Sequence, residues 1–163
     1  MKKQLIILAS GYVGYELLFW LIKKKSKIFH VFSTKKKQDI LIKDLCKKYE
    51  VDQSNYSEEK INKLLDKVDA KKFWILSLWN PYIIDKKLIK NVYDTVNLHP
   101  SYLPHVRGND TAAWILRKRK IAGVSINRLH KKIDCGDIWV RKKLKYDVTT
   151  TGKSLYELML NEI

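Results

Sequence analysis

The chain has 163 residues, a mass of 19.3 kDa and 45% hydrophobic residues. This length and hydrophobic content suit one folded domain over residues 1–163 and exclude a second full domain or a disordered chain. The apolar runs fall well short of the ~20 residues of a membrane span, and the charged start at residues 1–3 lacks a signal-peptide cleavage pattern. Two cysteines, Cys46 and Cys135, are too few for a disulfide framework or a zinc site. We therefore expect a cytoplasmic protein with no membrane partner and no metal.

Short apolar runs alternate with helical patterns along the chain. The run Leu5–Ala9 predicts a strand buried on both faces, followed by a glycine turn and a helix over Tyr15–Lys24. The expected elements continue with strand 28–33, helices 39–49 and 57–68, strand 73–78, helix 85–90, strand 95–99, helix 108–118, paired strands 123–129 and 138–144, and helix 151–161. This order predicts an α/β fold with a Rossmann-like, mostly parallel sheet flanked by helices.

The formal net charge of +16 is strong enough to attract nucleotides, phosphates or nucleic acid, but it does not choose among them. Only five of the 33 basic residues are arginine, the residue that suits bidentate phosphate or guanine recognition. Lysine runs such as 23–25 and 35–37 suit a solvated surface. A non-catalytic α/β protein that binds nucleic acid through its charge remains an alternative, and its affinity would fall steeply with salt.

Ligands of such sheets bind beyond the carboxyl ends of the strands. After the first strand, Ser10, Gly11 and Gly14 form an incomplete dinucleotide-binding pattern, and no acidic residue ends the second strand. A dinucleotide site is therefore not expected. The two glycines serve either a tight turn with close helix packing or a helix N-terminus that receives a phosphate or carboxylate, as in a mononucleotide-binding module.

The predicted strand 95–99 carries an amide, Asn97, and an imidazole, His99, near its end. Because they are two residues apart, both side chains point to one face of the strand. A carboxylate, Asp134, follows in a turn between two predicted strands. Singly, these residues also suit a strand end, a structural histidine and a plain turn. Together, they can stabilise an oxyanion and carry a proton, which favours catalysis.

The surrounding motifs strengthen this interpretation. They are N-L-H-P-S-Y-L-P at 97–104, R-G at 107–108, W-I at 114–115, G-V-S-I at 123–126 and I-D-C-G-D-I at 133–138. In these motifs the chain resembles the folate-dependent formyltransferases, which include glycinamide ribonucleotide, methionyl-tRNA and amino-sugar N-formyltransferases. The likeness is specific over about residues 73 to 160, whereas residues 1 to 72 match only in element order.

The resemblance implies a formyltransferase catalytic domain with Asn97, His99 and Asp134 as its catalytic residues. It also implies 10-formyltetrahydrofolate as formyl donor, without a metal. A neutral amine would attack the formyl carbon, and the Asn97 amide and a protonated His99 would stabilise the resulting oxyanion. We expect Asp134 to keep His99 charged by raising its pKa. Asp134 would also receive the proton of the amine through a water before that proton reaches the folate nitrogen.

In the resembled family, the segment after the strand 73–78 helps to form the folate pocket. Trp79 and Tyr82 are expected either to wall a flat pterin or to pack in the core. The cofactor-binding residues implied by the resemblance are Trp79, Asn80, Tyr82, Ile83 and Ile84, with Ile133 and the Asp134 backbone on the other side.

The acceptor expected from the motifs is a small-molecule amine of a nucleotide-linked amino sugar. Glycinamide ribonucleotide and methionyl-tRNA are the alternatives, although the chain ends at Ile163 without the further domain that binds tRNA. The candidate acceptor contacts are Ser10, Gly11, Tyr12 and Arg107, and Arg107 would equally brace its own loop. Because the family's catalytic domain commonly continues further, a C-terminally shortened or minimal form is also expected. The resemblance leaves a homodimer open.

Overall fold

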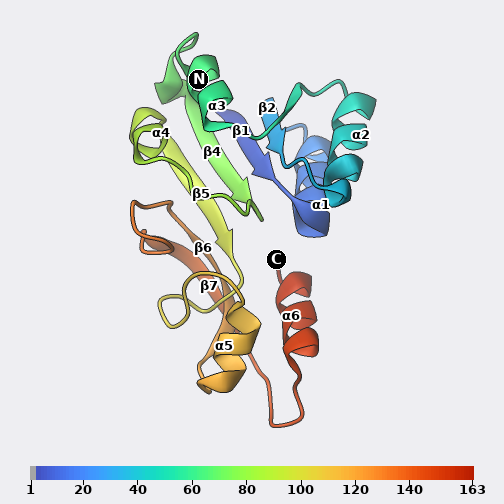
Figure 1. Cartoon of the computed structure of the whole chain (residues 1–163), viewed down its shortest axis with the longest axis vertical. Coiled ribbons are helices and arrows are strands. Elements are labelled where there is room, and N and C mark those ends of the chain that lie inside the picture. Colours follow the sequence, from blue (N-terminus) through green and yellow to red (C-terminus); the bar gives the residue numbers. More distant parts are fainter. Residues whose placement is uncertain (1–2) are drawn as a thin grey trace. The chain divides into compact units, whose positions relative to one another are not determined.

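The structure, a computed structural model, describes residues 3–163 (Figure 1), so Met1 and Lys2 of the charged start lie outside the described residues. Contacts divide the chain into two compact units, one up to Val96 and one from Asn97 to Ile163. The strand order of the seven-stranded sheet is β3-β2-β1-β4-β5-β6-β7. The predicted α/β class with a mostly parallel sheet is confirmed, whereas the single domain stays a prediction.

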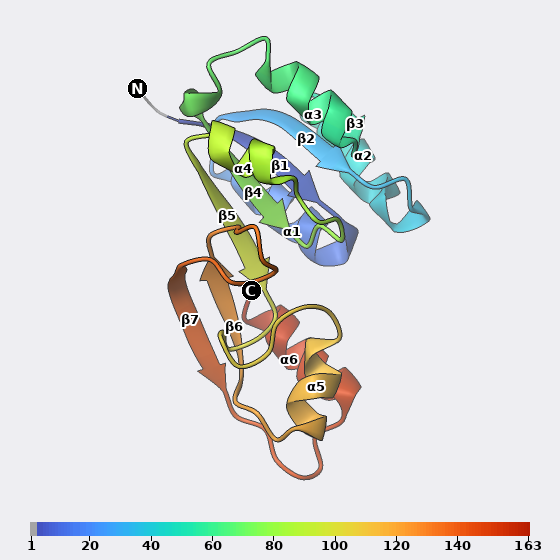
Figure 2. The same cartoon turned by 60° about the vertical axis from the view of Figure 1, so that its left-hand side comes forward.

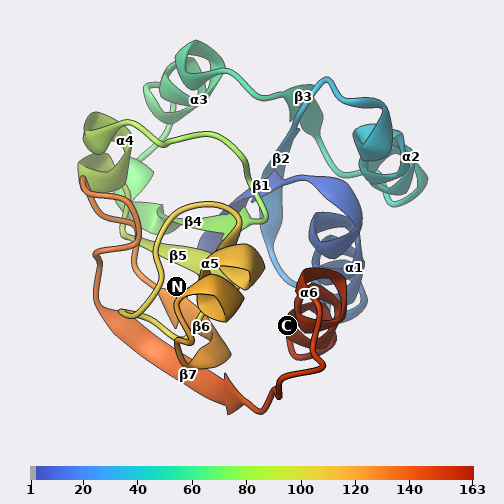
Figure 3. The ribbon, with the colours of Figure 1, turned by 60° about the horizontal axis from the view of Figure 1, so that its bottom comes forward.

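The first unit is a parallel sheet covered by helices. β1 pairs in parallel with both β2 and β4, and β2 pairs in parallel with β3. Figure 3 shows α1 and α2 on one side of these strands and α3 and α4 on the other. The strands are β1 Gln4–Ala9, β2 Ile28–Ser33, β3 Gln53–Asn55, β4 Phe73–Leu78 and the start of β5 Asp94–His99; the helices are α1 Gly11–Lys23, α2 Ile40–Lys48, α3 Glu58–Leu65 and α4 Lys86–Asn91, with 3-10 turns at Lys37–Asp39 and Ala70–Lys72.

The apolar runs of this unit form its buried core. Ile6, Ile7 and Leu8 of β1 are fully buried, as expected for a strand with helices on both faces. Ile7 and Leu18 belong to the core cluster in which α1 and α2 cover β1 and β2. A Cβ at Gly14 would lie 2.9 Å from the carbonyl oxygen of Leu78, so this glycine permits close helix packing. Packing is thus one role of Gly14 that the structure supports.

The second unit is an antiparallel sheet with two helices on it. β5 pairs with β6, which in turn pairs with β7. Figure 2 shows α5 and α6 together on one side of these strands, where Ile115, Val124 and Leu155 form part of a common core. Reciprocal hydrogen bonds between Thr151 and Ser154 begin α6. The elements are the end of β5, α5 Thr111–Arg117, β6 Ala122–Asn127, β7 Ile138–Leu144 and α6 Gly152–Asn161.

The structure differs from the expected elements in several bounds: α5 begins at Thr111 instead of 108, α3 ends at Leu65 instead of 68 and β6 ends at Asn127 instead of 129. The differences at α1 and β3 are the most informative. α1 begins at Gly11 instead of Tyr15, so Gly11 to Gly14 form the first helical turn instead of a separate glycine turn. β3 was not expected, because its three residues are polar and lack an apolar signature. Over residues 3–163, the longest helix has 13 residues, and none is both long and apolar enough to cross a bilayer.

Candidate active site

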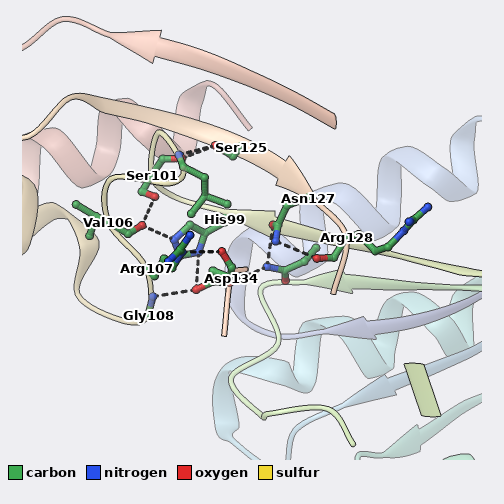
Figure 4. A network of polar contacts seen from close by, with 11 residues as sticks. His99, Ser101, Val106, Arg107, Gly108, Ser125, Asn127, Arg128 and Asp134 are labelled. Carbon is green, nitrogen blue, oxygen red and sulfur yellow. Dashed lines mark hydrogen bonds and ion pairs between the residues drawn. The ribbon is translucent and has the colours of Figure 1, made fainter. Parts of the chain in front are cut away.

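Side chains from a strand end and from a turn meet within the second unit. Asn97 and His99 lie at the end of β5 and, two residues apart, share one face of the strand. Asp134 comes from the connection between β6 and β7, with a positive φ of 48° that aspartate tolerates better than most residues. Figure 4 shows the polar network around His99 and Asp134. The structure therefore brings together the three residues that the sequence singled out.

The carboxylate of Asp134 connects the members of this network. Its Oδ1 accepts a hydrogen bond from Nδ2 of Asn97 at 3.3 Å, and its Oδ2 accepts one from the backbone N–H of Gly108 at 2.8 Å. The same Oδ2 lies 3.5 Å from Nδ1 of His99. Nε of Arg107 donates to the backbone carbonyl of Asp134 at 3.1 Å. Arg107, although exposed, thus braces the turn that carries the carboxylate.

The His99 residue is 4% exposed, and both of its ring nitrogens face acceptors. Nε2 lies 3.1 Å from the carbonyl oxygen of Val106, so Nε2 carries a hydrogen and donates it. Burial lowers the pKa of His99 below its ordinary value of 6.5, and this effect outweighs the charge of Asp134 and the Val106 bond, which both act to raise it. The expectation that Asp134 keeps His99 charged is therefore wrong for neutral pH, because desolvation of the ring is the larger effect.

This lowered pKa predicts acid sensitivity of the fold. In unfolded chains the pKa of His99 returns to about 6.5, so just below that pH the unfolded state binds more protons than the folded state. The free energy of unfolding should therefore fall as the pH is lowered from about 8 to about 5. His99→Asn should reduce this pH slope, measured by urea unfolding across the range. A smaller slope should remain, because burial also lowers the pKa of His30.

The matched control for this prediction is His105→Asn, since His105 is exposed in the loop after β5. It should keep the pH slope of the unaltered chain. The prediction fails if His99→Asn and His105→Asn have the same slope as the unaltered chain.

A buried serine holds the loop that follows β5. Oγ of Ser125 accepts a hydrogen bond from the N–H of Leu103 at 3.0 Å and donates one to the carbonyl of Ser101 at 2.7 Å. Ser101 in turn donates to the carbonyl of Val106, the group that also accepts from His99. On the other side, Arg141 of β7 donates to the carbonyl of Leu103 at 2.7 Å. The loop that orients His99 is therefore fixed by β6 and β7.

Ser125→Ala should destabilise the protein by about 1–2 kcal/mol, because the buried Leu103 N–H and Ser101 carbonyl lose this partner and keep their bond to each other at 3.1 Å. The free energy of unfolding in urea, followed by circular dichroism, measures the loss. Ser26→Ala, in the turn before β2, serves as control and should change it by at most about 0.5 kcal/mol. Equal losses in the two variants would contradict the prediction.

Sequence reasoning missed several polar partners of the site. Ser125, Asn127 and the backbone groups of Val106 and Gly108 were not singled out, although they complete the network. The sequence held one signal of these partners: polar residues at 125 and 127 lie on the same face of the predicted strand. In the structure both are buried. Buried polar groups of this kind need hydrogen-bond partners.

The predicted cofactor-binding segment lies in the first unit, after β4. Tyr82 is 43% exposed and stacks on Tyr56, with ring centroids 4.4 Å apart. Asn80 donates from Nδ2 to the carbonyl of Tyr82 at 2.8 Å. Ile83 is 74% exposed, whereas Ile84 is buried. Of the two alternatives for Tyr82, complete burial in the core does not occur. In the second unit, Ile133 is exposed next to Asp134.

The predicted acceptor contacts at the start of α1 are bonded to a buried carboxylate. Asp39 is fully buried, and its Oδ1 accepts hydrogen bonds from the hydroxyl of Ser10 at 3.2 Å and from the N–H of Gly11 at 2.8 Å. Its Oδ2 accepts from the N–H and the hydroxyl of Thr34. Tyr12, in contrast, is 68% exposed. The helix start therefore does receive an anion, but this anion belongs to the chain itself.

The curated proteins to which this chain is similar include two formyltransferases. GDP-perosamine N-formyltransferase of Brucella melitensis is 36% identical over 63 residues, 38% of this chain and 24% of that protein. Methionyl-tRNA formyltransferase of Malacoplasma penetrans is 27% identical over 89 residues, 54% of this chain and 28% of that protein. The chain thus spans about a quarter of the length of these curated relatives.

The fold is also that of a solved formyltransferase. The crystal structure of phosphoribosylglycinamide formyltransferase from Anaplasma phagocytophilum superposes with a TM-score of 0.79 over 99% of this chain and 80% of that chain, at 20% identity. A family model described as formyl transferase matches residues 19–162, which is most of the sequence. The chain therefore belongs to the formyl transferase family.

Proposed function

We propose that the protein transfers a formyl group from 10-formyltetrahydrofolate to a primary amine of a nucleotide-linked amino sugar. The observation that carries this proposal is the connection of Asn97, His99 and Asp134 through one carboxylate, on the motifs that the chain shares with its family. Acyl transfer to an amine needs stabilisation of an oxyanion and transfer of a proton, which an amide donor, an imidazole and a carboxylate can supply.

Asn97 is the donor that stabilises negative charge on the formyl oxygen. Its two Nδ2 contacts, to Asp134 and Asn127, are both 3.3 Å long. They exceed the usual N–H···O range of about 2.7–3.2 Å, so redirecting one hydrogen to a developing oxyanion costs little. Asn97 is only partly buried, which keeps its amide accessible to substrate.

Asp134 and His99 handle the proton. As the bond between the amine nitrogen and the formyl carbon forms, the proton of the amine passes through a water to the carboxylate of Asp134. From Asp134 this proton would be available to the folate nitrogen, which would leave as the formyl group is transferred. The neutral His99 ring has its unprotonated Nδ1 beside Asp134, 3.5 Å away, so it can share this proton.

The described residues fit a folate in their chemistry. The bound donor supplies the formyl group on a flat, partly apolar ring system. In the second unit, the exposed Ile133 offers apolar surface next to the Asp134 backbone, and we propose that these two residues contact the donor. The donor contacts expected from Trp79, Asn80, Tyr82, Ile83 and Ile84 stay a prediction from the sequence.

The proposed acceptor rests on the relatives and on the shared motifs. A GDP-perosamine N-formyltransferase is among the relatives, together with enzymes named for methionyl-tRNA. In the second unit, Arg107 is exposed and available to the acceptor. In the first unit, Tyr12 is exposed, whereas Ser10 and Gly11 shape the start of α1 around Asp39.

The test incubates the full chain with 10-formyltetrahydrofolate and, separately, with GDP-perosamine, phosphoribosylglycinamide or methionyl-tRNA, and detects formylated product by mass spectrometry. Formylation of the amino sugar is expected. Asp134→Asn should abolish it, whereas Asp137→Asn, at an exposed surface ion pair, should not. Formylation of another acceptor would overturn the proposed substrate but keep formyl transfer. No formylation, together with steeply salt-dependent nucleic-acid binding, would overturn the function.

A further inference from the structure

A buried carboxamide lies directly opposite Asn97. Asn127, at the end of β6, is 1% exposed, and its Cα is the register partner of Asn97 in the antiparallel β5–β6 pair. Its side-chain Oδ1 accepts a hydrogen bond from Nδ2 of Asn97 at 3.3 Å. Partners directly opposite each other in antiparallel strands are close enough for such side-chain contacts. Asn127 is therefore placed to act on the Asn97 amide.

The orientation of Asn127 is itself fixed. Its Nδ2 donates to the backbone carbonyl of Arg128 at 3.1 Å, which requires that Oδ1, and not Nδ2, face Asn97 (Figure 4). The neighbouring Arg128 backbone is held as well, because its N–H donates to the carbonyl of Asp137 at 2.8 Å. The Asn127 oxygen attracts the amide hydrogens of Asn97. It disfavours the flipped orientation of the Asn97 carboxamide, in which the oxygen of Asn97 would face the oxygen of Asn127.

We propose that Asn127 is a positioning residue, which holds one Nδ2 hydrogen of Asn97 and thereby leaves the other, the one that faces Asp134, for the formyl oxygen. The inference rests on the proposed function. A flipped Asn97 would present a carbonyl oxygen to the developing oxyanion, which repels it. Catalytic donors act only when they are aimed before the charge develops, so the partner that aims Asn97 should affect turnover without touching substrate.

The test compares Asn127→Leu, which removes the acceptor at similar volume, with Asn127→Asp, whose carboxyl in its protonated form keeps an oxygen opposite Asn97 and an O–H toward the Arg128 carbonyl. With the full chain, the formyl donor and the best acceptor, Asn127→Leu should lower kcat roughly 10- to 100-fold with little change in KM. Asn127→Asp should recover most of this loss. A smaller folded fraction would also lower the apparent kcat without changing KM, so denaturation curves of both variants are used to express kcat per folded molecule.

A double-mutant cycle shows whether Asn127 acts through Asn97. In an Asn97→Ala background, Asn127→Leu should have no further effect on kcat, because the group that it positions is gone. Additive losses in the cycle would overturn the inference. So would a loss that appears in KM alone, or an Asn127→Asp variant as impaired as Asn127→Leu.

A second readout does not depend on turnover. The side-chain amide signals of Asn97 in nitrogen-15 NMR should shift, and their hydrogen exchange should accelerate, in Asn127→Leu but not in Asn161→Ala, a change at the exposed end of α6. Unchanged Asn97 signals in Asn127→Leu would overturn the positioning. If the unaltered chain formylates no amine, the proposed function fails, and the NMR result still decides whether Asn127 orients Asn97.

Discussion

Asn97→Ala is expected to lower kcat about 10²- to 10³-fold, with the protein still folded. Removal of one donor aimed at a developing oxyanion typically has this effect, and we propose Asn97, at the end of β5, as such a donor. KM for the formyl donor should change little, because the interaction strengthens only as the charge develops. Steady-state kinetics with the acceptor that is formylated best gives both parameters.

The matched control for this prediction is Asn161→Ala. Asn161 is exposed at the end of α6, so its substitution should leave kcat within about twofold of the unaltered chain. If Asn97→Ala retained full turnover, Asn97 would have only a structural role at the strand end. That result would leave Asp134 and His99 to supply the catalysis.

Gly136→Ala is expected to destabilise the protein by about 3 kcal/mol, or roughly 6–12 °C in Tm. A Cβ at this position would lie 1.9 Å from the carbonyl oxygen and 2.7 Å from the carbonyl carbon of Arg128, so the backbone must move. Gly136 is two residues from Asp134, and the movement should also displace the carboxylate. Thermal unfolding by calorimetry measures the loss, and a turnover assay on the folded fraction tests the displacement.

Gly152→Ala provides the comparison. Gly152 is the first residue of α6, and a Cβ there would meet no atom within 4 Å. This variant should have the Tm of the unaltered chain or a slightly higher one, because alanine favours helix. A Gly136→Ala variant as stable as Gly152→Ala would show that the turn at Asp134 adapts without cost.

Most strands, and the meeting of the site residues, were predictable from local patterns. β2 and β4 have the bounds that the sequence predicts, because continuous apolar runs between polar turns suit strands buried on both faces. The meeting of Asn97 with Asp134 follows from strand alternation and from a turn between paired strands. In contrast, β3 has no apolar signature, since it is a short edge strand.

Three other features of the candidate sites depend on tertiary structure. The lowered pKa of His99 follows from its burial, and a sequence does not show how far a ring is removed from water. The Asn97–Asn127 contact requires the β5–β6 register, which a shift by one residue would abolish. The anion at the start of α1 is Asp39, from a segment almost thirty residues away, so motif inspection alone suggested an external phosphate or carboxylate instead.

The hydrogen bonds described around Asp134, His99 and Ser125 all join residues between Asn97 and Arg141. One continuous stretch of about a quarter of the chain therefore carries the residues to which we assign catalysis, together with their supports. None of these bonds involves a residue before β5. The proposed catalytic network is thus encoded within this stretch, and substitutions in the first unit remove none of its hydrogen-bonding groups.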